Sequence, residues 1–398
     1  MAKLLNNRTL IIIFLLVTAL VSLQNYLFFL AGINHINNNH INNFIIYRTT
    51  YLHLINNIDI YLPFPYQFQD RFVYSPTFAV LMAPFAWLPY IISVPLWIGL
   101  NAYIIWSCIK YLPQSDIKKR FFVTGIIIFE LITSLQNMQT NTFIAGFMIL
   151  GFCFLEKKKP FWAALFIMLA AYVKVFGLAA ALLFFFYPDK KKFILSMLFW
   201  GIVLIALPLL VVSPGQLFYL YKSWIWHLQE AHYNEEIRIK INEVYRLSVM
   251  GWLKIWFHFE PPSIIIQGIG TVLLLIPLAL IKNYRSMQFR YFFVASVLIY
   301  CNIFNHIAES PSYIISVIGI ALWYVNENRN KFNDTLLVLA FVFTTMSATD
   351  IFPVYIRQTY FYPYVVKAVP CILIWFYLQY RLLTGNFDNG VLRGAPVK

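Results

Sequence analysis

Two aspartates lie where a carboxylate could do proton-transfer chemistry. Asp70 precedes Arg71 and stands four residues before Tyr74, ahead of an apolar run that begins at Ser75. A carboxylate at the mouth of a membrane cavity could accept a hydroxyl proton, so Asp70 is the first candidate for a general base and Asp59 the second. Arg71 and Tyr74 are candidate substrate contacts. Simpler roles stay open, because Asp70 could pair with Arg71 at a helix start and Asp59 could lie in a surface turn.

A histidine and a glutamate form a second candidate pair. His306 and Glu309 are three residues apart at the outer end of two apolar runs, just before Ser310 and Pro311. On a helix they would share one face. A histidine within a membrane is often a core residue whose hydrogen bonds are satisfied, but the nearby carboxylate favours a functional one. We therefore take His306 as a third catalytic candidate and Glu309 as a substrate contact.

Lys174 is a cation inside an apolar run, where it costs a few kcal/mol unless it is paired or reaches water. It could bind a phosphate group or pair with Glu130, and snorkelling to an interface is equally open. The turn 136–142 offers Gln136 and Asn137, whose neutral amides suit the hydroxyl groups of a sugar. Such residues also form ordinary hairpin turns.

The composition indicates an integral membrane protein. Of the 398 residues 61% are hydrophobic, 19% are aromatic and only 12% are charged, which excludes a soluble globule and a disordered chain. The net charge of +14 comes from short basic runs between apolar stretches, a pattern typical of membrane-flanking anchors rather than of nucleic-acid binding. Phosphate-binding glycine motifs are absent, and all four cysteines lie in apolar runs without metal-ligand spacing.

The apolar runs predict an all-α polytopic protein with about twelve transmembrane helices in a single integral membrane domain, 1–398. Between them lie a first outer loop (32–74), a second outer loop (213–262) and a cytoplasmic tail (381–398), and we expect interfacial helices in both loops. With the N-terminus inside, most lysines and arginines fall on cytoplasmic segments, so both termini are predicted to be cytoplasmic in a cell inner (plasma) membrane. The predicted segments are 10–31, broken helices over 75–112, a helical hairpin over 121–155, two short helices over 161–186 broken near Lys174, and 193–212, 263–281, 291–304, 311–325, 335–348 and 363–380.

The membrane-entering segment carries a motif that resembles a known family. The sequence YSPTFA at 74–79, followed by Ala-Pro at 83–84 and Leu-Pro at 88–89, is similar to the signature of glycosyltransferase family 87. Further similar segments follow in the expected order over about residues 10 to 380: the Gln136–Asn137 turn, the break at 171–174, the segment 248–252, and Asn305–His306 before Glu309.

This resemblance implies a glycosyltransferase C-type fold and a polyprenyl-phosphate sugar donor, usually a mannose donor. The sugar would pass to a lipid or glycan acceptor on the outer leaflet. The family's general base is usually an aspartate in an Asp-x-x-x-Tyr context, and here that position is Asn43, four residues before Tyr47. An amide cannot accept the acceptor's proton. Either the base has moved to Asp59 or Asp70, or the chain does different chemistry, or none.

We therefore expect an inverting hexosyltransferase that needs no cofactor beyond its lipid-linked sugar donor, with no metal site assigned and any metal requirement left open. Its partners would be the donor, the acceptor and the lipid bilayer, and not a nucleic acid. Two other classes stay open: a transporter or flippase for a lipid-linked or small polar substrate, and a non-catalytic lipid-binding scaffold. A transporter of this size usually has internal repeats, and the sequence has none.

Overall fold

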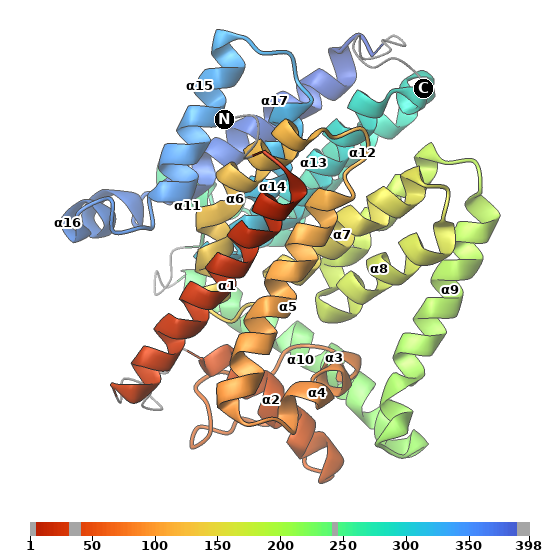
Figure 1. Cartoon of the computed structure of the whole chain (residues 1–398), viewed down its shortest axis with the longest axis vertical. Coiled ribbons are helices and arrows are strands. Elements are labelled where there is room, and N and C mark those ends of the chain that lie inside the picture. Colours follow the sequence, from red (N-terminus) through yellow and green to blue (C-terminus); the bar gives the residue numbers. More distant parts are fainter. Residues whose placement is uncertain (1–4, 32–40, 241–245, 388–398) are drawn as a thin grey trace. The chain divides into compact units, whose positions relative to one another are not determined.

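The chain folds into helices joined by turns and loops (Figure 1). A computed structural model describes residues 5–31, 41–240 and 246–387, and within these ranges there is no strand. The predicted all-α class is confirmed. A helix satisfies its own backbone hydrogen bonds, so it is the stable form in the hydrocarbon layer of a membrane, where no water is present to do so.

The chain divides into two compact units, Met1–Ala179 with Lys191–Val244, and Ala180–Lys190 with Tyr245–Lys398. The single integral membrane domain over 1–398 stays a prediction. The helices of the first unit are α1 (Asn7–Leu30), α2 (Asn42–Ile55), α3 (Pro76–Leu81), α4 (Ala83–Ala86), α5 (Tyr90–Lys110), α6 (Ile117–Gln136), α7 (Asn141–Glu156), α8 (Pro160–Val173), α9 (Lys190–Ala206), η3 (Leu207–Leu210) and α10 (Pro214–Lys240).

The second unit follows after residue 245, and a 3₁₀-helix, η2 (Val175–Phe186), runs across the division between the units. Two of the later helices, η7 and η8, are π-helices. The helices after α10 are α11 (Val249–Phe257), α12 (Ser263–Leu275), η4 (Ile276–Ala279), η5 (Ile281–Arg285), α13 (Met287–Ile303), η6 (Ser310–Ser312), α14 (Tyr313–Val325), α15 (Lys331–Leu339), η7 (Ala340–Met346), α16 (Val354–Ile356), η8 (Arg357–Phe361), η9 (Val366–Ala368) and α17 (Val369–Thr384).

Four helices of the described chain are long and apolar enough to cross a membrane by length and composition: Asn7–Phe28, Tyr90–Lys110, Lys190–Leu210 and Val366–Thr384. Six further apolar helices of 10–17 residues are shorter than a full crossing. The chain is therefore a membrane protein. The number of about twelve crossings, the glycosyltransferase C-type arrangement and the cytoplasmic termini stay predictions.

Local signals place several boundaries where the sequence predicts them. Ser75 caps α3 by accepting a hydrogen bond from the backbone N–H of Phe78 at 3.2 Å, and Pro76 occupies the first turn. The predicted hairpin is α6 and α7, which meet at the polar turn after Gln136. The predicted break near Lys174 separates α8 from η2. Both outer loops contain helices: α2 lies in the first, α10 and α11 in the second.

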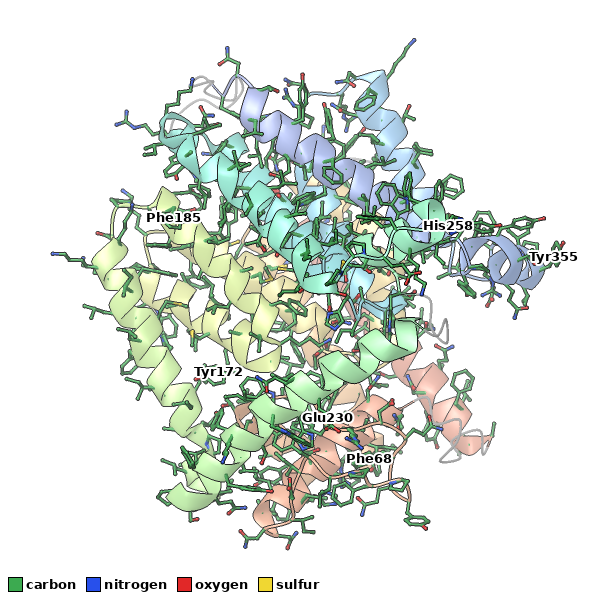
Figure 2. All side chains as sticks on the ribbon, turned by 180° about the vertical axis from the view of Figure 1, so that it is seen from behind. Phe68, Tyr172, Phe185, Glu230, His258 and Tyr355 are labelled. Atoms are coloured by element: carbon green, nitrogen blue, oxygen red, sulfur yellow. The ribbon has the colours of Figure 1, made fainter. Side chains whose placement is uncertain are left out.

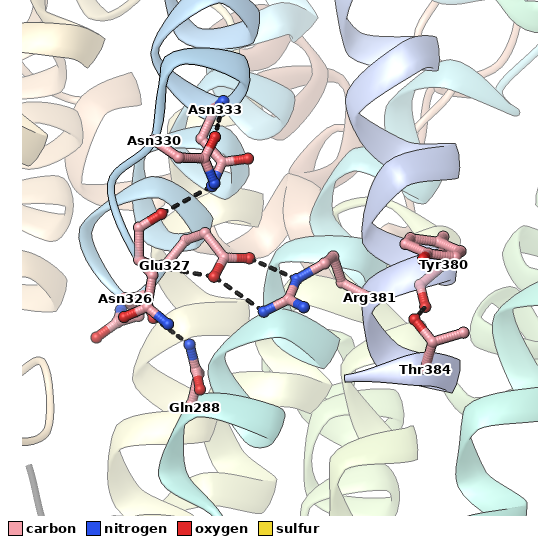
Figure 3. A network of polar contacts seen from close by, with 9 residues as sticks. Gln288, Asn326, Glu327, Asn330, Asn333, Tyr380, Arg381 and Thr384 are labelled. Atoms are coloured by element: carbon pink, nitrogen blue, oxygen red, sulfur yellow. Dashed lines mark hydrogen bonds and ion pairs between the residues drawn. The ribbon is translucent and has the colours of Figure 1, made fainter. Parts of the chain in front are cut away.

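A buried ion pair ties the end of α17 to the turn after α14 in the second unit (Figure 3). The Arg381 guanidinium donates from Nε to Glu327 Oε2 at 2.8 Å and from Nη2 to Oε1 at 3.0 Å. The Glu327 side chain is only 3% exposed, whereas that of Arg381 is 24% exposed. Gln288 on α13 donates to the neighbouring Asn326 carbonyl at 2.7 Å, so three helices converge on this turn.

We expect Arg381→Met to lower thermal stability more than Glu327→Gln. The first change leaves a buried carboxylate without its counter-ion and should cost roughly 3 kcal/mol, whereas the second leaves a partly exposed guanidinium that still has an amide oxygen to bond. Thermal unfolding of the purified protein, followed by tryptophan fluorescence, measures both. The double variant should recover part of the loss. Equal melting temperatures for the two single variants would contradict this account.

Candidate functional site

Tyr74 is the centre of a buried polar cluster in the first unit. Its hydroxyl group lies 2.9 Å from the Tyr47 hydroxyl and accepts a hydrogen bond from Thr140 Oγ1 at 3.3 Å. Its backbone carbonyl accepts a hydrogen bond from the Tyr61 hydroxyl at 3.1 Å. The first outer loop and the α6–α7 turn therefore meet at one tyrosine, which is 8% exposed.

Lys174 joins this cluster at the end of α8. Its Nζ donates to Asn141 Oδ1 at 2.9 Å and lies 5.8 Å from the centre of the Tyr74 ring. Both contacts are with neutral groups, and Lys174 makes no ion pair with Glu130 or with any other described carboxylate. The predicted pairing with Glu130 is therefore absent. The half-buried amine of Lys174 therefore meets the first residue of α7 without a carboxylate partner among the described residues.

The backbone turns sharply directly after Lys174. Gly177 donates its N–H to the Lys174 carbonyl at 2.9 Å, and the chain then turns back against α8. A Cβ atom at Gly177 would lie 2.7 Å from the Ala170 carbonyl carbon, so only glycine fits this approach. Ser75 also ties the start of α3 to the end of α8 by donating to the Tyr172 carbonyl at 2.5 Å.

The second outer loop contacts the first through α10, which Figure 2 shows carrying Glu230 beside the segment of Phe68. Tyr219 donates to Asp59 Oδ2 at 2.8 Å, Trp224 Nε1 donates to the Val73 carbonyl at 3.1 Å, and the Tyr221 hydroxyl lies 2.6 Å from Thr77 Oγ1. α10 also exposes apolar side chains. These are Phe218, Ile225 and Trp226.

His227 and Glu230 form a positioned pair on the same helix. His227 Nδ1 lies 3.2 Å from Glu230 Oε2, which also accepts from Arg71 Nη1 at 3.4 Å. The imidazole stacks on the Tyr61 ring with centroids 5.3 Å apart and planes at 27°. His227 Nε2 makes no hydrogen bond with a described residue, and its side chain is 16% exposed. The imidazole is therefore held by Glu230 and Tyr61, while its Nε2 has no hydrogen-bond partner among the described residues.

Burial raises the pKa of the Tyr61 phenol well above its ordinary value, with smaller contributions from Tyr221 and Asp59. The hydrogen bond to Asp59 is the main reason why the pKa of Tyr219 is also raised. Both hydroxyl groups therefore stay protonated at neutral pH and act as donors. Tyr61 fixes the Tyr74 backbone, and Tyr219 holds Asp59.

The two predicted aspartates differ in their surroundings. Asp59 Oδ1 accepts from the Tyr61 backbone N–H at 2.9 Å, and its Oδ2 holds Tyr219, so both oxygens serve the loop. Asp70 is exposed and makes no hydrogen bond or ion pair with a described residue. The Asp70–Arg71 pair, which the sequence left open, is absent, and Arg71 pairs with Glu230 instead.

Each of Asn43, Gln136 and Asn137 donates a hydrogen bond from its side-chain amide within the fold, that of Asn137 to the Thr133 carbonyl at 2.8 Å. Asn43 Nδ2 donates to the Asn137 backbone carbonyl at 2.9 Å, which ties α2 to the α6–α7 turn. Gln136 Nε2 donates to Gln24 Oε1 of α1 at 2.7 Å. The Asn43 contact needs a donor, and a carboxylate would face a carbonyl oxygen there.

His306 and Glu309 lie in the second unit, where they do not share a helical face. α13 ends at Ile303, and Glu309 has extended backbone angles. His306 is 8% exposed, and its Nδ1 lies 3.4 Å from Gln267 Nε2. Glu309 pairs with the buried Arg246 at 3.4 Å. No group of three or more histidine, cysteine, aspartate or glutamate side chains in the described ranges could hold a metal ion.

The pair His227–Glu230 and the partner Asn141 are the residues that the sequence reasoning missed. The pair has the same three-residue spacing as His306–Glu309, and that signal was readable in the sequence. Asn141 lies in the predicted polar turn 136–142, but its contact with Lys174, 33 positions away, could not be predicted from the sequence.

Residues 72–304, more than half of the chain, match the sequence model of glycosyltransferase family 87. The match includes Tyr74, Lys174 and the pair His227–Glu230, whereas Asn43 and His306 lie outside it. No curated protein matches the chain.

We expect Gly177→Ala to disturb the Lys174 region, because the new methyl group would overlap the Ala170 backbone. Overpacking of this kind destabilises by about 1–3 kcal/mol, which a thermal melt would detect. Gly125→Ala is the matched control, since a Cβ there meets nothing within 4 Å and alanine favours a helix. The same melting temperature for both variants would contradict the proposed close approach.

Proposed function

The chain belongs to glycosyltransferase family 87, and from this premise we propose that it transfers a hexose, first of all mannose, from a polyprenyl-phosphate donor to a hydroxyl group of a lipid or glycan acceptor. The reaction would take place at the outer face of a cell inner membrane, with both termini cytoplasmic. The bond between sugar and phosphate already carries the activation, so the proposal includes no further cofactor.

The observation that carries the proposal is that Lys174 has no carboxylate partner among the described residues. Its printed contacts there are neutral, the Asn141 amide and the Tyr74 ring, so its amine can pair with an anion. Asn141 is the first residue of the 16-residue helix α7, and helix N-termini favour phosphate groups. A phosphate between Lys174 and this helix start would be stabilised as negative charge develops on the leaving group.

The chemistry also needs a proton acceptor near the attacking hydroxyl group. We assign this role to His227 ahead of Asp70, because Glu230 and Tyr61 hold the imidazole, whereas Asp70 has no positioning contact. The acceptor oxygen bonds to the anomeric carbon while the bond from that carbon to the phosphate oxygen breaks. The hydroxyl proton passes to His227 Nε2, and the polyprenyl phosphate leaves with the bonding electron pair.

The two proposed groups are linked through tyrosines. Tyr61 stacks on His227 and donates to the Tyr74 carbonyl, and the Tyr74 ring lies beside Lys174. Asp59 then positions the loop. His306 as a catalytic residue and Glu309 as a substrate contact stay predictions.

The function is tested by supplying the purified chain with radiolabelled polyprenyl phosphomannose and membrane lipids. We expect transfer of label to an acceptor, and Lys174→Met should reduce it at least tenfold through weaker use of the donor phosphate. Lys157→Met is the matched control, because Lys157 also lies over a tyrosine ring, that of Tyr111 at 4.0 Å, outside the cluster. If no sugar is transferred from any polyprenyl donor, the proposed activity is wrong, and the transporter and the lipid-binding scaffold remain as the alternatives.

The base is tested by comparing His227→Ala with Asp70→Asn in the same assay. General-base catalysis contributes about 10² to 10⁴-fold, so His227→Ala should lose turnover by that factor without losing donor binding. Added imidazole should restore part of the rate, which a purely structural defect would not allow. If Asp70→Asn abolishes turnover and imidazole rescues nothing, Asp70 is the base and His227 only positions Arg71 through Glu230.

A further inference from the structure

A groove of about 560 Å³ lies between the beginnings of α8 and α9. Figure 1 shows these two helices side by side. The walls of the groove are the first turn of α8, from Lys159 to Trp162, and the residues Lys192, Leu195 and Ser196 of α9. All of them belong to the first unit.

The walls are fixed to one another. Trp200 Nε1 donates to the Phe161 carbonyl at 3.0 Å, and the Phe161 and Trp200 rings lie 5.0 Å apart. Further along, the Tyr172 hydroxyl donates to the Gly201 carbonyl at 2.9 Å. Within the groove, Ser196 bonds back to the Lys192 carbonyl at 2.7 Å. The groove is therefore a formed feature between two packed helices.

The groove combines two cations with apolar surface. Lys159 and Lys192 face it from opposite walls, and neither makes an ion pair with a described residue. Phe161 and Trp162 are 40% and 47% exposed beside them, and Leu195 is 65% exposed. An anionic head with an apolar tail matches this pattern, whereas a free inorganic anion would leave the apolar wall uncovered.

We infer that this groove binds one anionic phospholipid of the cytoplasmic leaflet. The lipid phosphate would lie between Lys159 and Lys192, and its upper acyl segments would cover Phe161, Trp162 and Leu195. Basic pockets between transmembrane helices on the cytoplasmic side bind such headgroups, and tryptophan favours the same depth. The inference uses the predicted orientation and does not depend on sugar transfer.

The test measures binding of phosphatidylglycerol to the full chain in zwitterionic detergent by native mass spectrometry. Lys159→Gln with Lys192→Gln should weaken binding about thirtyfold, from the contribution of each lysine near an anionic surface. The control carries Lys158→Gln with Lys191→Gln, which removes the same charge from the same lysine runs outside the groove lining. Its affinity should fall by less than threefold.

Several outcomes would overturn the inference. An equal loss of phosphatidylglycerol affinity in both double variants would show that the lysine runs attract anionic lipid only through their general positive charge. Displacement of the lipid by millimolar inorganic phosphate would show a phosphate site without lipid selectivity, and tighter binding of polyprenyl phosphate than of phosphatidylglycerol would make the groove a site for that lipid instead. Melting temperatures in detergent alone should match between the two double variants, and a lower value only in the groove variant would mean that the two lysines support the fold.

Discussion

A lysine within an apolar segment is tolerated only if polar partners come to it, and Lys174 depends on two elements that do so. Asn141 meets its ammonium group from the start of α7, and Tyr74 covers it from the first outer loop. Tyr74 in turn is held by Tyr47, Thr140 and Tyr61. One polar cluster of the first unit therefore holds Lys174 through neutral groups.

Asn43 stands where the family resemblance implies an aspartate as general base. Its amide donates to a backbone carbonyl, a contact that a carboxylate could not make, so the residue has a structural use that suits its type. The acid–base function must then come from elsewhere if the chain is an enzyme. On α10 an imidazole is available that lies against the same loop.

The sequence predicted what local rules determine. The cap at Ser75, the hairpin turn after Gln136 and the break at Lys174 follow from proline, polar turns and charge, and all three are present. The partners were not predictable in the same way, because Arg71 and Glu230 are 159 residues apart and only the fold brings them together. His306 and Glu309 do not share a face for a local reason, since the helix ends at Ile303, before the proline at 311.

The 3₁₀-helix that follows Lys174 changes how far a short apolar segment reaches. Its 12 residues rise about 2.0 Å each and extend about 24 Å, where an α-helix of equal length would extend about 18 Å. A hydrocarbon layer is about 30 Å thick. The tighter winding thus lets 12 residues cover about four-fifths of that thickness, a length for which an α-helix would need about 16 residues.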